Sequence, residues 1–403
     1  MDQVLAKKPL KSADRGLCQE LVYGVIRWEA TLDWLVTRKT QGRAQKPLLQ
    51  HLLRLGLYQL FWLDRVPGHA AVNESVAIAK RQGFQSQSGF INAVLRGYAR
   101  ELDATKTALL ELKKKDPALG HSHPQWLFDR WRRSFGESNA VHLMEWNNQP
   151  PKTFARINTL KADPATVLER WRDEDVDYDF VRKDWLEENL AFILKSHPPL
   201  SRLVSFQKGM FYVQDPSTLF AVQELEPTPG EAILDLCAAP GGKLTHIAQV
   251  IRNEGRVVAY DNSPERMNLI KENCARLGVT CVKPVLPAGL EGEAGPFDRV
   301  LVDAPCSNTG VLRRRVELRW RIRPEEIARL RSAQFELLQQ AARLLKPRGR
   351  LIYSTCSLES EENDLVVETF LKEQPAFTLS RRRNLFPWIE GVDGAYVARL
   401  ERK

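Results

Sequence analysis

The stretch Ile233–Lys243, Ile-Leu-Asp-Leu-Cys-Ala-Ala-Pro-Gly-Gly-Lys, constrains the fold of this chain more than any other segment. It predicts a short apolar strand, a loop of small residues and a helix that begins near Leu244. Pro240 excludes a regular helix through the loop, while Gly241 and Gly242 would let backbone N–H groups approach a ligand closely. Taken alone, the glycine pair is also typical of a plain strand-to-helix turn, so a nucleotide cradle is one of two interpretations.

A second apolar strand, Val257–Tyr260, follows and ends at Asp261. Open α/β sheets place at this point a carboxylate that binds the diol of a ribose. The glycine loop matches neither G-x-G-x-x-G nor a Walker A motif, because Lys243 is followed by Leu244 rather than by Ser or Thr. The pattern therefore favours S-adenosylmethionine as cofactor over a dinucleotide or a magnesium triphosphate.

Composition narrows the class of partner. The formal charge of +9 favours an anionic partner, with nucleic acid as the leading candidate, although a basic surface can also serve solubility alone. The sequence has no apolar run of about 18 residues and no signal peptide at its start, which predicts a cytoplasmic protein without membrane contact. Its six cysteines form no C-x-x-C pair, so we expect reduced thiols and no metal site.

The hydrophobic pattern changes along the chain. Helical periodicity dominates the first hundred residues, a mixed strand and helix pattern follows, and strands alternate with helices from Glu231 onward. Such alternation predicts a mostly parallel sheet that is covered on both faces and binds ligands at its carboxyl edge. We expect three domains: an all-α domain over 1–140, a small α+β module over 141–218 and an α/β domain over 219–403.

Two cysteines should meet at that carboxyl edge. The strand at 298–303 leads to Asp303 and Cys306, and the strand at 350–354 leads to Cys356. A single cysteine is more often a small buried hydrophobe than a catalyst, but two at strand ends beside one ligand site favour chemistry. A thiolate that attacks C6 of a pyrimidine makes C5 nucleophilic toward a methyl sulfonium. Asp303 could stabilise a proton on N3, and a second thiol or a general base could remove the C5 proton.

Several sequence blocks resemble the RNA cytosine-5 methyltransferases of the RsmB (Sun/Fmu) and NOL/NOP group. The catalytic blocks are Leu236–Lys243, Asp303–Ser307, and Ser354–Ser357 followed by Glu361-Glu362-Asn363. Upstream, the segments Asp14–Gly24, Leu52–Gly56, His69–Asn73 and Phe90–Leu95 are similar to the NusB-like RNA-binding domain of the RsmB branch. The resemblance implies an all-α NusB-like domain, a small α+β (RRM-like) module and a Rossmann-like class I methyltransferase domain.

The resemblance also implies residue roles and a substrate. Cys356 would be the nucleophile and Cys306 would assist product release, with Asp303 and Lys243 in the catalytic set. DNA cytosine-5 methyltransferases attack instead with the cysteine of the earlier block. The substrate would be a cytosine of 16S rRNA that is flipped out of its stack. Apart from the resemblance, we expect a monomer. The cofactor would be bound by Cys237, Ala238, Ala239, Pro240, Gly241, Gly242, Lys243, Asp261, Arg266 and Asp303.

The sequence leaves two alternatives to this hypothesis. Pro287 stands where the family commonly has an acidic residue that meets adenine, which favours an alternative: a non-catalytic RNA-binding assembly or antitermination factor. A tRNA substrate is a second alternative, because the catalytic blocks do not exclude it.

The basic run after Cys306 predicts a phosphate clamp rather than a solvated face. The residues expected to bind RNA are Arg313, Arg314, Arg315, Arg319 and Asn158.

Overall fold

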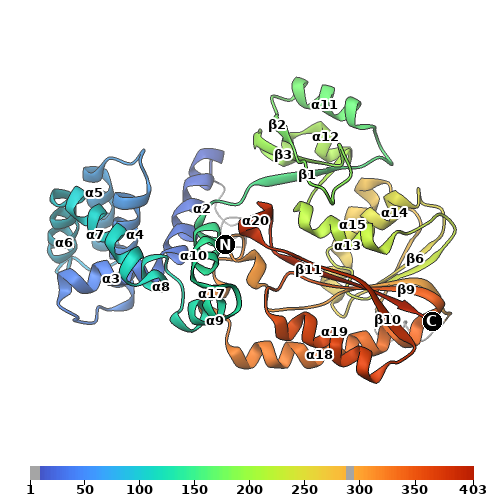
Figure 1. Cartoon of the computed structure of the whole chain (residues 1–403). Coiled ribbons are helices and arrows are strands. Elements are labelled where there is room, and N and C mark those ends of the chain that lie inside the picture. Colours follow the sequence, from blue (N-terminus) through green and yellow to red (C-terminus); the bar gives the residue numbers. More distant parts are fainter. Residues whose placement is uncertain (1–9, 287–294) are drawn as a thin grey trace. The chain divides into compact units, whose positions relative to one another are not determined.

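The computed structural model describes residues 10–286 and 295–403, which divide into two compact units (Figure 1). Unit 1 combines Met1–Gln149 with Arg313–Arg321, and unit 2 combines Pro150–Leu312 with Ile322–Lys403. The expected domain boundary at residue 140 falls inside helix α10, Glu137–Asn148. The basic segment after Cys306 belongs to the helical unit rather than to the α/β domain. Pro287 lies outside the described residues.

Unit 1 is helical, as its periodicity predicts. Leu49, Leu53 and Leu57 repeat at helical spacing along α4, and all three are buried in its core. Tyr98 donates its hydroxyl hydrogen to the carbonyl of Leu35 over 2.6 Å, which joins two helices at the centre of this core. The helices are α2 (Ser12–Arg27), α3 (Glu29–Thr40), α4 (Pro47–Trp62), α5 (Gly68–Arg81), α6 (Ser88–Arg100), α7 (Leu102–Lys115), α8 (Pro117–Gly120), α9 (Gln125–Phe135), α10 and α17 (Leu318–Arg321).

Unit 2 begins with the small α+β module. Its four strands pair in the order β2-β3-β1-β4, and each neighbouring pair is antiparallel. Trp171 of α11 packs on Phe192 and Phe211, which gives the module an aromatic core. The elements are β1 (Thr153–Ile157), α11 (Pro164–Asp173), β2 (Asp177–Phe180), β3 (Ala191–Ser196), α12 (Val204–Gln207) and β4 (Phe211–Val213).

The α/β domain contains a seven-stranded sheet in the order β10-β11-β9-β8-β5-β6-β7. The five strands from β9 to β7 are parallel, and helices cover both faces (Figure 1). The strand order reverses between β5 and β8, which is where open sheets bind ligands. The strands are β5 (Ala232–Asp235), β6 (Arg256–Tyr260), β7 (Val282–Val285), β8 (Phe297–Asp303), β9 (Leu345–Thr355), β10 (Phe377–Leu385) and β11 (Ala395–Arg402).

The helices of this domain lie in two layers. One layer contains α13 (Phe220–Leu225), α14 (Gly242–Val250) and α15 (Pro264–Leu277), and the other contains α18 (Pro324–Leu344) and α19 (Asp364–Glu373). A separate apolar core fills the space on each face of the sheet. Within the described ranges, no helix is both long enough and apolar enough to cross a bilayer.

Candidate active site

The cofactor loop follows β5 at the reversal point of the sheet. Gly241 precedes α14 with a φ of +103°, a conformation that only glycine adopts without strain. Gly242 also serves packing, and its approach to a ligand stays a prediction. A Cβ on Gly242 would lie 3.1 Å from Nε2 of Gln214 and 3.3 Å from Cε1 of Tyr212, both in the α+β module. The module therefore buttresses the cofactor loop.

Acidic side chains surround the loop. The buried Asp261, after β6, accepts hydrogen bonds from the backbone N–H of Ala239 and Ser263 at 3.3 and 3.1 Å. Arg266 lies 3.4 Å from the Asp261 carboxylate and donates to the carbonyl of Ala239 over 2.6 Å. Sequence reasoning missed Asp235, the last residue of β5. Burial, reinforced by the nearby carboxylate of Asp303, raises the pKa of Asp235 to about 7.

Lys243 connects the cofactor loop to β8. Its Nζ lies 2.6 Å from Oδ2 of Asp303, and Oδ1 of Asp303 accepts a hydrogen bond from the Ser354 hydroxyl at 2.9 Å. Burial by itself would lower the pKa of Lys243, but the Asp303 carboxylate outweighs this effect and the pKa is raised. Lys243 therefore stays an ammonium, and it lines the same cavity as Cys356.

The two cysteines meet, as their positions at strand ends predict. The Sγ atoms of Cys306 and Cys356 are 3.4 Å apart, and the Cys356 thiol donates to Oδ1 of Asn308 over 3.2 Å. Cys306 is only 8% exposed. The hydrogen bond with Cys356, together with burial, raises the pKa of Cys306 well above its ordinary value. Burial likewise raises the pKa of Cys237 in the cofactor loop, so Cys237 stays a thiol.

A cavity of about 40 Å³ opens beside Cys356, with room for roughly three water molecules. Its lining includes Cys356 but not Cys306, which lies behind its partner. The cavity therefore distinguishes the two thiols by access. The lining residues are Ser217, Thr218, Ala221, Lys243, Val311, Ser354, Thr355, Cys356, Asp393, Gly394, Ala395 and Val397.

Two of the four arginines expected to clamp RNA are buried inside unit 1. Arg319, 0% exposed, donates to the carbonyls of Arg27, Ser122 and Asn147 and to Oδ1 of Asn148. Arg313, 1% exposed, lies 3.9 Å from the centre of the Trp146 ring. The phosphate-clamp prediction is wrong for this pair, because their guanidinium groups satisfy buried acceptors and an aromatic face.

Arg315 is exposed and Arg314 is half-buried, and their contact with RNA stays a prediction. Asn158 also differs from its predicted role. It is 2% exposed, and its side-chain amide donates to the carbonyls of Gly209 and Leu277, each over 2.8 Å. It therefore joins the module to the end of α15 rather than contacting RNA.

The buried position of Arg319 predicts a large effect on folding. Arg319→Ala removes the donor to several buried acceptors, so we expect a loss of about 3 kcal/mol of unfolding free energy. For a unit of this size, that loss lowers the melting temperature by about 6–12 °C in calorimetry. Arg315→Ala in the same segment is the control and should change the melting temperature by less than about 2 °C. Equal melting temperatures for the two variants would contradict this role.

Comparison with known proteins agrees with this architecture. The family described as 16S rRNA methyltransferase RsmB/F matches residues 222–401, the NusB family matches 1–100, and an RsmF/B-like ferredoxin-like domain matches 123–193. A probable ribosomal RNA small subunit methyltransferase B of Bacillus subtilis is 34% identical and covers 100% of this chain and 94% of the relative. The chain belongs to the RsmB/F methyltransferase family. A protein of the same description from Synechocystis is 37% identical over 93% of this chain and 84% of the relative.

Solved structures also resemble this RsmB/F family member in their fold. The crystal structure of PH0851 is 26% identical with a TM-score of 0.81 and covers 100% of this chain and 93% of its own. A methyltransferase homolog from Pyrococcus horikoshii is 27% identical with a TM-score of 0.63 and covers 72% of this chain and 98% of its own. The predicted NusB-like domain, small module and Rossmann-like methyltransferase domain are confirmed.

S-adenosylmethionine is the cofactor of this RsmB/F family member, and the residues of the loop fit it. Asp261 offers carboxylate oxygens for ribose hydroxyls at the end of β6. Asp235 and Asp303 offer acceptors for the ammonium group of the methionine part. The first turn of α14, from Gly242, offers backbone N–H groups that suit its carboxylate. When bound, the cofactor supplies an electrophilic methyl group.

Proposed function

We propose that this protein transfers the methyl group of S-adenosylmethionine to C5 of a cytosine in 16S rRNA through a covalent bond between Cys356 and C6. The observation that carries the proposal is the arrangement of the two thiols. Cys356 lines the cavity beside Lys243, while Cys306 lies buried 3.4 Å behind it. The relatives, named as small-subunit rRNA methyltransferases, support the choice of RNA.

Each residue has a task in this reaction. The Cys356 thiolate adds to C6 of the cytosine while N3 gains a proton from solvent, which it returns when the base is released. In the adduct, N3–H donates a hydrogen bond to Asp303, which is held by Lys243 and Ser354. C5 gains the methyl group, and a base in the site then removes the C5 proton. The electron pair of that C–H bond reforms the C5–C6 double bond as the bond between C6 and Cys356 breaks. The protonated Cys306 donates a hydrogen bond to the departing sulfur, which assists release.

The test is a methylation assay with tritiated S-adenosylmethionine on unmodified 16S rRNA, assembling small subunits and tRNA. We expect label in 16S rRNA that is recovered as 5-methylcytosine after digestion. Label in tRNA alone would show that tRNA is the substrate instead of 16S rRNA. Label in a base other than cytosine would overturn the proposed methylation at C5. Neither label nor micromolar binding of the cofactor would favour an RNA-binding assembly factor over an enzyme.

A further inference from the structure

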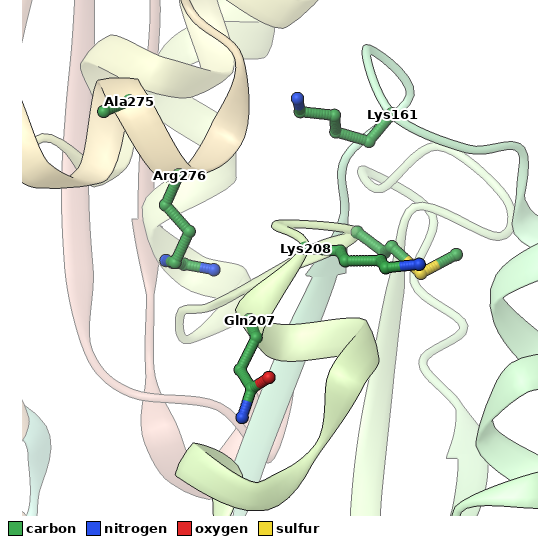
Figure 2. Close-up of a pocket in the computed structure, with 6 residues that line it drawn as sticks. Lys161, Gln207, Lys208, Ala275 and Arg276 are labelled. Carbon is green, nitrogen blue, oxygen red and sulfur yellow. The ribbon is translucent and has the colours of Figure 1, made fainter.

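A basic hollow of about 510 Å³ lies in unit 2, between the α+β module and the carboxyl-terminal end of α15 (Figure 2). Three separate segments contribute cations to it: Lys161 follows β1, Lys208 follows α12, and Arg276 belongs to the last turn of α15. α15 begins at Pro264, beside the cofactor loop, and its 14 residues span about 20 Å. The hollow therefore lies at the end of α15 opposite to Arg266, which contacts the cofactor loop, and no cysteine lines it. Its lining residues are Lys161, Gln207, Lys208, Met210, Ala275 and Arg276.

Buried contacts hold the walls of the hollow in place. The Asn158 amide bridges the carbonyls of Gly209 and Leu277, which are the neighbours of Lys208 and Arg276 in the sequence. Gly209 has a φ of +70°, and a Cβ there would lie 2.0 Å from the carbonyl oxygen of Arg276. Asn158 and Gly209 thus fix the distance between the two walls. A site whose walls are fixed before binding loses less entropy when a ligand arrives.

Arg276 is also fixed. Arg276 donates from Nη1 to the carbonyls of Phe206 and Phe211 at 3.0 and 3.2 Å, and its guanidinium lies 4.2 Å from the centre of the Phe206 ring. The stem of Lys161 crosses Gly278, where an added Cβ would lie 2.6 Å from Cε of Lys161. Lys208 is exposed.

Opposing negative charge is weak at the hollow. No acidic residue is among its lining residues, and within the described ranges neither Lys161 nor Lys208 has an ion-pair partner. The end of a helix normally presents carbonyl groups that repel anions. Here the carbonyl of Leu277 accepts from Asn158 and that of Cys274 from the backbone of Val279. The hollow therefore favours an anion.

We propose that this hollow binds the phosphodiester backbone of the substrate RNA and anchors the strand at a distance from the target base. The inference rests on the proposed function, since it takes RNA as the substrate. A strand fits better than a single nucleotide, because the lining offers neither an aromatic platform for a base nor a carboxylate for a ribose. Phosphate contacts position an RNA without reading its sequence.

The double variant Lys161→Ala with Lys208→Ala tests this anchor and spares the structural Arg276. We expect binding of a 16S rRNA fragment to weaken about tenfold near physiological salt, with a salt slope shallower by about 1.5. KM for RNA should rise while kcat at saturating RNA and affinity for S-adenosylmethionine stay at wild-type values. Lys271→Ala with Lys372→Ala removes the same charge from exposed positions outside the hollow and should leave both quantities near wild type.

Equal salt slopes for the wild type and the hollow variant, or equal losses in the two double variants, would overturn the proposal. A small free anion as the real ligand would overturn it too. In that case inorganic phosphate would raise the melting temperature of the wild type alone, while RNA affinities stayed equal. Failure of the proposed function looks different. The wild type would then transfer no label to RNA, whereas binding of RNA would still depend on Lys161 and Lys208.

Discussion

Cys356→Ala should abolish methyl transfer, whereas Cys306→Ala should accumulate RNA that is covalently bound to the protein. Removing the attacking sulfur leaves no route to the C6 adduct, so we expect a loss of at least about three orders of magnitude in kcat. Removing the Cys306 thiol leaves attack intact. It takes away the hydrogen bond that stabilises the departing Cys356 sulfur at 3.4 Å, so release becomes the slow step.

The measurement is a denaturing gel of each variant after incubation with 16S rRNA and S-adenosylmethionine, read beside tritium transfer. Cys306→Ser keeps a hydrogen-bond donor and should release product faster than Cys306→Ala. Cys18→Ala, in helix α2 of unit 1, is the matched control and should behave as wild type in both readouts. An adduct with Cys356→Ala, and none with Cys306→Ala, would reverse the two roles and make the earlier cysteine the nucleophile.

Local patterns predicted the parts of the site that depend on the ends of strands. Asp261 and Cys356 directly follow apolar strands and Asp303 ends one. Parallel strands bring their carboxyl ends to one edge of the sheet, whatever the conformation of the loops. The sequence did not predict β10, because its Ser380–Arg383 segment is polar and charged. In the structure β10 pairs with β11 at the edge of the sheet, where charged side chains are tolerated.

The burial and hydrogen-bond partners of polar side chains could not be predicted in the same way. Arg315 and Arg319 look alike in the sequence, but Arg319 is buried by acceptors nearly 200 or more residues away, at Ser122 and Arg27. Asn158 likewise finds its partners at Gly209 and Leu277. Hydrogen bonds over such separations depend on how complete units pack, and no local periodicity records them. For this reason the basic run after Cys306 suggested RNA contact, although the structure buries Arg313 and Arg319 inside unit 1.

Glu362 is the buried residue whose loss should most disturb the two thiols together. It is 0% exposed, and Oε1 accepts from the Ser307 backbone N–H at 2.8 Å and from Nε2 of Gln334 at 3.0 Å. Its Oε2 accepts from the hydroxyls of Ser307 and Ser357. These serines directly follow Cys306 and Cys356, so one carboxylate ties the two cysteine loops together. Burial raises the pKa of Glu362, while its hydrogen bonds oppose that shift.

Glu362→Ala should cost about 3 kcal/mol of stability, because several buried donors lose their acceptor, and should lower kcat by about 100-fold as the loops separate. KM for S-adenosylmethionine should stay near wild type, since no hydrogen bond joins Glu362 to the described cofactor loop. Glu361→Gln, one residue earlier and only half-buried, is the control. It should leave kcat within twofold of wild type and the free energy of unfolding within about 0.5 kcal/mol.

Glu362→Gln separates the electrostatic part of this role from the structural part, because the amide keeps the shape and some of the hydrogen bonds. The Glu362 carboxylate is one of the groups that raise the pKa of Cys306. Its removal favours the Cys306 thiolate, so alkylation of Cys306 in a Cys356→Ala background should begin at lower pH. The same neutral substitution should slow release, since a thiolate donates no hydrogen bond to the departing sulfur. An unchanged alkylation profile together with normal release would leave Glu362 as a purely structural tie between the loops.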